Sequence, residues 1–589
     1  MSGLFQSLLT AAIVVAYAVH LLAGRRLSTW LERVGRAAEA LGIPPILLAF
    51  SGIFAVLVLR SLAVMILIAA LPAGAPVSLW VTRLVATALM AACLAVACSA
   101  PAASRALSVL TSVLWAVIAE TRWRAGGAVA LGYALLAASR AGQRAEWSER
   151  TLSVIEFIPA RILALPECIR RRRACAESYL YTQPIVLGEL AAMVGVLLSA
   201  GGLRVQAALA SAGAPLGPDE GNYLMAARLL REKGRLETRN PIFPHGAPTR
   251  ASRMPLYPAY LAACAYIAGP AGIRLARLGQ LEMELLTCLF VFGIARAMSG
   301  RVAALAGAAL QALHPALAAQ SARLLTETPA ALLLTVAAYL MLRAAAARRA
   351  TAWYCCAGLV VGLATLVRPD TLLFGLVLLP ILPRLWRPRL HGLLCAFAFC
   401  AAMGIVMAPW AWRNQRLFGR TVWGTTHAGY NLWQGNTIKY AGMQRWAARA
   451  AAARVLEREG IDPRDEAGID RALMREGLAL MWRDLTQRPL AYARLIGRKA
   501  RLLFRPTLGG LQVVSQAVLI GALFGILICA TRPRHSVGLL LLPVYSVALH
   551  LLTFAEDPRY LVPITPILTV LAGLTVAFLV RPPSPSMHS

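Results

Sequence analysis

The chain has 589 residues, of which 59% are hydrophobic and 15% are charged, and its mean hydropathy is +0.63. Soluble globular proteins carry about 25% charged residues, so this composition excludes a disordered chain, a disulfide-rich secreted scaffold and an ordinary cytosolic enzyme. The formal net charge of +32 superficially suggests a nucleic-acid partner. The arginines, however, recur in short clusters between apolar runs, which is the arrangement of cytoplasmic loops in a multi-pass membrane protein, so no nucleic-acid partner is predicted.

Apolar segments that approach the roughly 20 residues of a membrane-spanning helix recur along the whole chain. They lie at about 7–24, 46–72, 80–99, 104–119, 126–139, 184–204, 275–297, 302–318, 324–345, 353–367, 371–384, 391–410, 511–531, 536–554 and 560–580. Several are short or poorly separated, so the sequence predicts an all-α polytopic membrane protein with about 13–15 transmembrane helices. The first segment has no basic amino-terminal region and no clear cleavage site, which predicts a retained helix rather than a removed signal peptide.

The arginine clusters predict how the chain is oriented, because cytoplasmic loops carry an excess of Arg and Lys. The arginine-rich run 140–173 should therefore lie inside, and segment 184–204 should lead the chain out. Two long loops, 205–272 and 411–510, then lie outside. The same alternation places the later arginine clusters of the short loops inside, which supports the assignment.

These assignments divide the chain into three parts. Residues 1–183 form a membrane region of unknown role, with about five helices and a basic cytoplasmic segment. Residues 184–580 form the main module, and an amphipathic stretch at about 445–505 predicts helices in its second external loop. Residues 581–589 form a cytoplasmic tail.

Carboxylates, arginines and aromatic residues gather in six short clusters on the side predicted to be external. The clusters are Gly217–Tyr223, Arg253–Pro258, Thr326–Glu327 with His314–Pro315, Arg368–Asp370, Pro409–Asn414 and Glu556–Tyr560. A carboxylate can take a proton from an attacking hydroxyl, arginines can hold a phosphate through forked hydrogen bonds, and interfacial aromatic rings can seat an amphiphile or a sugar. The mixture predicts group transfer from an anionic leaving group. No cysteine pair has metal-ligand spacing with a histidine partner, so no zinc site is predicted.

The order of these clusters resembles a known family. Asp219-Glu220 followed by Tyr223 and a helix, and then Arg253-x-Pro-x-Tyr257-Pro258, resembles the first external loop of GT-C glycosyltransferases, in the branch of protein O-mannosyltransferases and the lipid A aminoarabinose transferase. The later blocks that are similar are Thr326-Glu327, Gly362-Leu-Ala-x-x-x-Arg368-Pro369, Pro409-Trp410-x-x-Arg413-Asn414, Gly429-x-Asn431-Leu-x-x-Gly435-Asn436 and Pro558-Arg559-Tyr560. The resemblance covers roughly 184–580. About 180 N-terminal residues have no counterpart, which leaves the acceptor open.

The resemblance implies a GT-C-like fold and an inverting glycosyltransferase that moves a hexosyl or pentosyl group from a polyprenyl-phosphate-linked sugar to a glycan, lipid or protein acceptor. The reaction would take place at the outer face of a bacterial cytoplasmic membrane, with membrane lipid as a further partner. The implied catalytic carboxylates are Asp219, Glu220 and Glu327. The implied donor-phosphate ligands are Arg253, Arg368, Arg413 and Arg559, and the implied substrate-lining residues are Tyr223, Tyr257, Trp410 and Tyr560. No cofactor is predicted, and a divalent cation is left open because only some families of this superfamily use one.

Each of these residues also has a simpler structural interpretation. Asp219 follows Pro218 before a helical pattern, so it could be the helix N-cap, and Glu220 could be a first-turn acid favoured by the helix dipole. Arg253 could anchor the loop to lipid headgroups by snorkelling. Glu327 could pair with Arg323 one helical turn earlier. The tryptophans could form only an interfacial belt, and His314, His427 and His550 are interpreted as structural.

Two other functions use similar features. A transporter or flippase of lipid-linked glycans would place polar groups near mid-membrane and show paired repeats, and neither is visible in the sequence. A polysaccharide polymerase or ligase shares lipid-linked donors and external arginines, but the loop that carries Asp219 and Glu220 argues against it.

Overall fold

The computed structural model describes residues 185 and 187–580, apart from 212–214, 240–241, 243–247, 438–444, 506–511 and 556. All of them belong to one of the two compact units of the chain, residues 127–589. The five apolar segments predicted before residue 140, the basic run 140–173 and the tail 581–589 lie outside the described residues.

The described residues are helical, with one isolated bridge between Thr238 and Thr249. The α-helices run α8 (Leu187–Ala210), α9 (Pro218–Lys233), α10 (Leu256–Ala268), α11 (Gly272–Ser299), α12 (Arg301–Leu313), α13 (Pro315–Ser321), α14 (Glu327–Ala346), α15 (Ala350–Val367), α16 (Phe374–Leu385), α17 (Arg389–Phe418), α18 (Ala428–Asn436), α19 (Arg445–Arg458), α20 (Glu466–Gln487), α21 (Pro489–Leu503), α22 (Gln512–Ala530), α23 (Val537–Leu552) and α24 (Thr565–Val580). Short 3₁₀ turns are η1 (Gly269–Ala271), η2 (Pro369–Thr371) and η4 (Pro558–Ile564).

Six stretches of the described residues are helical, long and apolar enough to cross a membrane, and the bent pair of α12 and α13 would make a seventh. The helices α22 and α23 are apolar but shorter. Each apolar segment predicted between 184 and 580 overlaps at least one helix of the structure, and segment 302–318 overlaps both α12 and α13. The span Leu256–Ser299 begins inside the predicted loop 205–272, so the end of that loop was placed too late. The class of an all-α polytopic membrane protein is therefore confirmed, and the total of 13–15 transmembrane helices stays a prediction.

The break between α12 and α13 explains why an arginine is buried among apolar helices. Pro315 has no backbone N–H, and the two helices meet at an angle of 55°, so carbonyl oxygens near the break lose helical partners. The guanidinium of Arg204, on α8, donates to the carbonyl oxygens of Gln311 and Ala312 at 3.1 and 2.8 Å. It also pairs with Glu284 of α11 at 3.0 Å. The charge pair thus stabilises a bent helix inside the bundle.

Close backbone packing holds the bundle together. Helix α15 packs against α14 and α17, and α24 packs against α12 and α22. A Cβ atom at Gly358 of α15 would collide with the backbone of Phe399 in α17. Small residues at such crossings let helices approach closely, which is the usual source of attraction between helices in lipid.

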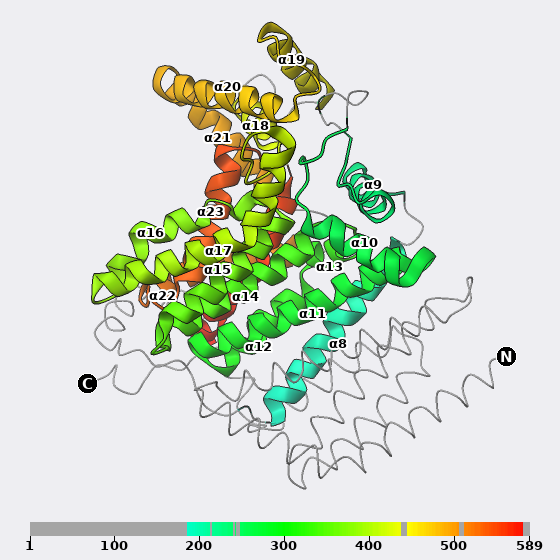
Figure 1. Cartoon of the computed structure of the whole chain (residues 1–589). Helices are drawn as coiled ribbons and strands as arrows, with labels where there is room; N and C mark the ends of the chain where they lie inside the picture. Colours follow the sequence, from blue (N-terminus) through cyan, green and yellow to red (C-terminus); the bar gives the residue numbers. More distant parts are fainter. Residues whose placement is uncertain are drawn as a thin grey trace, which may run out of the picture. The chain divides into compact units, whose positions relative to one another are not determined.

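The two long loops lie at one end of the bundle, where α9, α18, α19 and α20 extend beyond the apolar helices (Figure 1). The amphipathic stretch predicted at 445–505 forms α19, α20 and α21, as expected. Glu466 joins the loops, because its carboxylate accepts from the backbone N–H groups of Arg250 and Ala251 and from the hydroxyl of Thr426. The end of the bundle that carries the polar clusters is therefore built from both loops together.

Candidate functional site

The first turn of α9 presents Asp219 to the site. The N-cap of this helix is Gly217, and Pro218 occupies the first helical position, where its missing N–H costs nothing. The prediction that Asp219 could be the N-cap is therefore wrong, because the helix begins earlier than that interpretation required. Its carboxylate is left to make contacts outside the helix.

Glu220 closes the start of the same helix. Its Oε2 accepts from the Gly217 N–H at 2.9 Å, so the side chain at the third helical position caps the backbone of the N-cap residue. Its Oε1 accepts from the Leu324 N–H at 2.9 Å, and Arg323 lies 3.4 Å from Oε2. This buried carboxylate thus ties α9 to the turn before α14.

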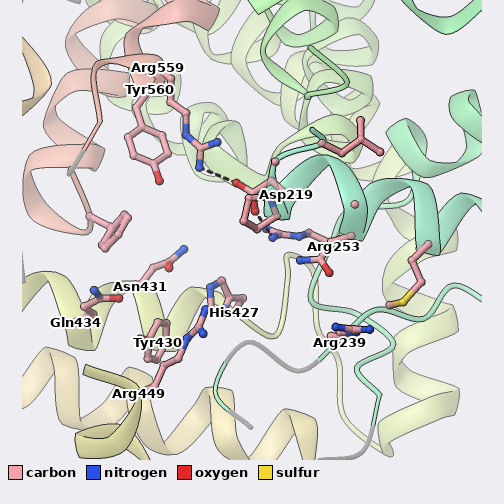
Figure 2. Close-up of a pocket in the computed structure, with 17 residues that line it drawn as sticks. Asp219, Arg239, Arg253, His427, Tyr430, Asn431, Gln434, Arg449, Arg559 and Tyr560 are labelled. Carbon is pink, nitrogen blue, oxygen red and sulfur yellow. Dashed lines mark hydrogen bonds and ion pairs between the residues drawn. The ribbon is translucent and has the colours of Figure 1, made fainter. Parts of the chain in front are cut away.

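Two arginines hold the Asp219 carboxylate from opposite sides (Figure 2). Arg253 Nη2 donates to Oδ1 at 2.8 Å, and Arg559 Nη2 donates to Oδ2 at 2.9 Å. The three residues are far apart in the sequence and come from α9, the end of the first loop and η4. Arg253 also lies over the ring of Tyr223, with 5.3 Å between guanidinium carbon and ring centroid, and Arg559 lies 5.4 Å from the centroid of Tyr560. The charged cluster is therefore braced by aromatic rings.

This cluster forms one wall of a cavity of about 630 Å³. The cavity is lined by residues of both long loops and by the segment around η4. The lining residues are Leu216, Gly217, Pro218, Asp219, Gly221, Asn222, Met225, Arg239, Arg253, His427, Tyr430, Asn431, Gln434, Arg449, Phe554, Arg559 and Tyr560. Asp219 is the one carboxylate among these described residues, against four guanidinium groups, so the cavity suits an anionic ligand.

Glu327 and Arg368 lie apart from the cavity, in a buried charge network behind it. Arg368 donates to Glu327 Oε1 at 3.0 Å and to Asp370 Oδ2 at 2.8 Å. His550 lies 3.7 Å from the same Asp370 oxygen. The prediction that Glu327 could pair with Arg323 is wrong, since Arg323 precedes α14 and contacts Glu220 instead.

Arg413 and Trp410 lie near the end of α17 and also outside the cavity lining. Arg413 lies over the Trp410 ring at 4.8 Å and donates to the carbonyl oxygen of Arg250 at 3.2 Å. Trp410 is buried, and its indole N–H donates to the Gly424 carbonyl oxygen at 2.9 Å. Both residues connect the two loops.

The predicted tyrosines divide between core and cavity. Tyr257 is buried and donates to Gln280 at 2.6 Å, and Tyr223 packs edge-on against it with ring centroids 5.1 Å apart. Tyr223 packs against the Arg253 guanidinium, and neither of these two rings lines the cavity. Tyr560 does line it, and its ring packs beside His550 and Phe554.

Most residues of the cavity wall opposite Asp219 were not predicted from the sequence. His427, Tyr430 and Asn431 come from the start of α18 (Figure 2). Only Asn431 belonged to a motif that had been noted, and His427 had been interpreted as structural. Arg239 and Arg449 carried no spacing signal at all, and neither has an acidic partner among the residues that the structure describes.

The residues that the structure describes include no candidate metal site. Within the described parts of the chain, no three or more His, Cys, Asp or Glu side chains lie close enough together to hold a metal ion. Both oxygens of Asp219 face guanidinium groups instead.

Comparison with known proteins places the resemblance in the middle of the chain. Residues 252–412 match the family model of dolichyl-phosphate-mannose-protein mannosyltransferase. This match confirms the resemblance to the protein O-mannosyltransferase branch of GT-C glycosyltransferases, from the segment before α10 to the last third of α17. A comparison with curated proteins finds no match.

Several solved structures are similar at low identity. The archaeal oligosaccharyltransferase AglB from Archaeoglobus fulgidus, in complex with an inhibitory peptide and a dolichol-phosphate, is 16% identical with a TM-score of 0.43, over 66% of this chain and 50% of that chain. ArnT from Cupriavidus metallidurans bound to undecaprenyl phosphate is 17% identical with a TM-score of 0.31, over 67% of this chain and 78% of that chain. The chain thus spans about half the length of the oligosaccharyltransferase.

Proposed function

We propose that this protein is a membrane glycosyltransferase that takes a sugar from a polyprenyl-phosphate donor and transfers it with inversion to an acceptor. The observation that carries the proposal is the Asp219 carboxylate held between Arg253 and Arg559, at the wall of a cavity of about 630 Å³. The family match to residues 252–412 supports it. The proposed location of the reaction is the outer face of a bacterial cytoplasmic membrane, and this location rests on the arginine pattern of the sequence.

Arg253 and Arg559 are suited to the donor phosphate. Their Nη2 atoms reach the two oxygens of a single carboxylate, at 2.8 and 2.9 Å, so they can converge on one small oxyanion. Forked guanidinium groups bind phosphate oxygens and stabilise the charge that grows on a leaving phosphate.

Asp219 is suited to act as the general base. In an inverting transfer the acceptor oxygen forms a bond to the anomeric carbon, and the bond from that carbon to the phosphate oxygen breaks. The phosphate leaves with the electron pair, and the acceptor proton passes to the carboxylate. A single displacement of this kind inverts the anomeric carbon, and base catalysis contributes about 10²–10⁴-fold.

The remaining predicted residues take supporting positions in this proposal. Glu220 positions the first turn of α9 and hence Asp219. Arg368, held by Glu327 and Asp370, lies 5.9 Å from the Tyr560 ring and supports the segment that carries Arg559. Donor-phosphate binding is thus assigned to two of the four predicted arginines.

The test is turnover by the purified chain in detergent with a polyprenyl-phosphate sugar and a membrane extract as acceptor source. Release of polyprenyl phosphate with labelled sugar on a new product is expected. Asp219→Asn should lower turnover by about 10²–10⁴-fold. Arg253→Lys should lower it because the fork is lost, and Arg253→Ala should lower it further.

The control is Arg228→Ala, on the exposed side of α9, where Arg228 pairs with Glu232 and with no other carboxylate of the described residues. Its turnover should match that of the wild type. Movement of the intact lipid-linked sugar across vesicles without any transfer would favour the flippase alternative. If Glu327→Gln abolishes turnover while Asp219→Asn leaves it normal, the base is Glu327.

A further inference from the structure

Asp219 is the proposed general base, and Arg253 and Arg559 are the proposed phosphate ligands. These two roles compete with each other. In the structure Arg253 and Arg559 each direct Nη2 to the carboxylate of Asp219. The same two guanidinium groups are the proposed ligands of the donor phosphate. A carboxylate engaged by two arginines is a poor base, and arginines engaged by a carboxylate are poor phosphate ligands.

We propose that Asp219 is an internal competitor of the donor phosphate, so that phosphate binding releases the base and the returning carboxylate weakens the binding of the product. This inference rests on the proposed function. A phosphate and the Asp219 carboxylate on the same pair of arginines would lie about 5 Å apart, where like charges repel strongly in a partly buried site. The phosphate therefore displaces the carboxylate instead of joining it.

The surroundings allow this exchange. Asp219 and Arg253 are each about one quarter exposed, so neither is locked in a packed core. Glu220, next along the helix, is held by two backbone N–H groups, which keeps the first turn of α9 in place while the Asp219 side chain moves. Within the described lining of the cavity there is no second carboxylate to replace Asp219.

The exchange gives the reaction an order. The donor must bind before Asp219 can accept the acceptor proton, so the base is available only when a leaving group is in place. After transfer the product is a phosphate monoester, which carries more negative charge than the phosphodiester donor and holds arginines more strongly. Once Asp219 has lost its proton to solvent, its carboxylate competes for both guanidinium groups and promotes product release.

The test is equilibrium binding of undecaprenyl phosphate, without any sugar, to the full chain in detergent. Asp219→Asn keeps the size of the side chain but removes the competing charge, so it should bind this lipid at least fivefold more tightly although it loses turnover. Glu232→Gln removes the same charge from the exposed side of α9, where Glu232 pairs with Arg228, and should bind as the wild type does. The gain should disappear in the double variant D219N/R253A.

Stability gives a second readout, which does not depend on equal folding of the variants. Undecaprenyl phosphate should raise the unfolding temperature of Asp219→Asn more than that of the wild type. If the wild type binds the lipid and Asp219→Asn binds it equally or more weakly, the arginines bridge both anions and the inference is wrong, while the proposed function stands. If neither the wild type nor Asp219→Asn binds the lipid, the proposed function itself fails.

Discussion

Lys499 links helix α21 to the segment that leads to Arg559, and its burial predicts how the free energy of unfolding depends on pH. It is buried on α21, and its ammonium donates to the carbonyl oxygens of Leu551 and Thr553 at 2.8 and 3.0 Å. Phe554, which lines the cavity, follows directly. No described carboxylate pairs with Lys499. Burial lowers its pKa from 10.5 to about 7.

The sign of the effect follows from proton binding. Between about pH 7 and pH 10 the unfolded state keeps the proton on Lys499 while the folded state has lost it, so the free energy of unfolding rises with pH. Each pH unit contributes about 1.4 kcal/mol, which gives about 3 kcal/mol between pH 7 and 9.5. Below about pH 7 both states are protonated and the contribution is constant. Lys499→Met has no proton to exchange and lacks this slope.

The measurement is unfolding of the purified chain in detergent at pH 6.5, 8 and 9.5. As the pH rises, the free energy of unfolding of the wild type should increase relative to that of Lys499→Met. Arg494→Met, on the exposed side of the same helix, should give a difference that does not change with pH. A constant difference for Lys499→Met as well would mean that the two carbonyl oxygens keep the ammonium charged, and the reasoning from burial would be refuted.

Three further outcomes are expected. Cysteines placed at Ser211 and at Glu457 should react with a membrane-impermeant thiol reagent in intact cells, and labelling of both only after lysis would reverse the topology. Gly435→Ala should destabilise the chain by several kcal/mol, because a Cβ atom there collides with the backbone of the segment after α23, whereas Gly404→Ala faces open space and should change unfolding by about 1 kcal/mol or less. Glu220→Ala leaves two backbone N–H groups without their carboxylate, so it should lower the unfolding temperature by an amount equivalent to about 2–4 kcal/mol; an unchanged temperature would show that these two hydrogen bonds are dispensable.

Local patterns in the sequence predicted the class of the fold and part of the cluster. Hydrophobic segments of sufficient length form helices in a membrane whatever their neighbours are, because every backbone polar group must be satisfied within the segment. The apolar segments between residues 184 and 580 therefore coincide with helices of the structure. Asp219, Arg253 and Arg559 could be selected because each stands in a short motif with turn-forming prolines beside an apolar run.

Only the tertiary structure decided which charges meet. The sequence offered Arg368 and Arg413 on equal terms with Arg559, yet Arg368 pairs with Glu327 and Asp370 away from the cavity. Asp219 and Arg559 are 340 residues apart and meet through packing of the whole bundle. Helical periodicity and spacing act over a few residues, whereas ion pairs depend on which helix ends the bundle brings together. For the same reason the sequence pattern did not predict Arg239 and Arg449, which line the cavity from two separate loops.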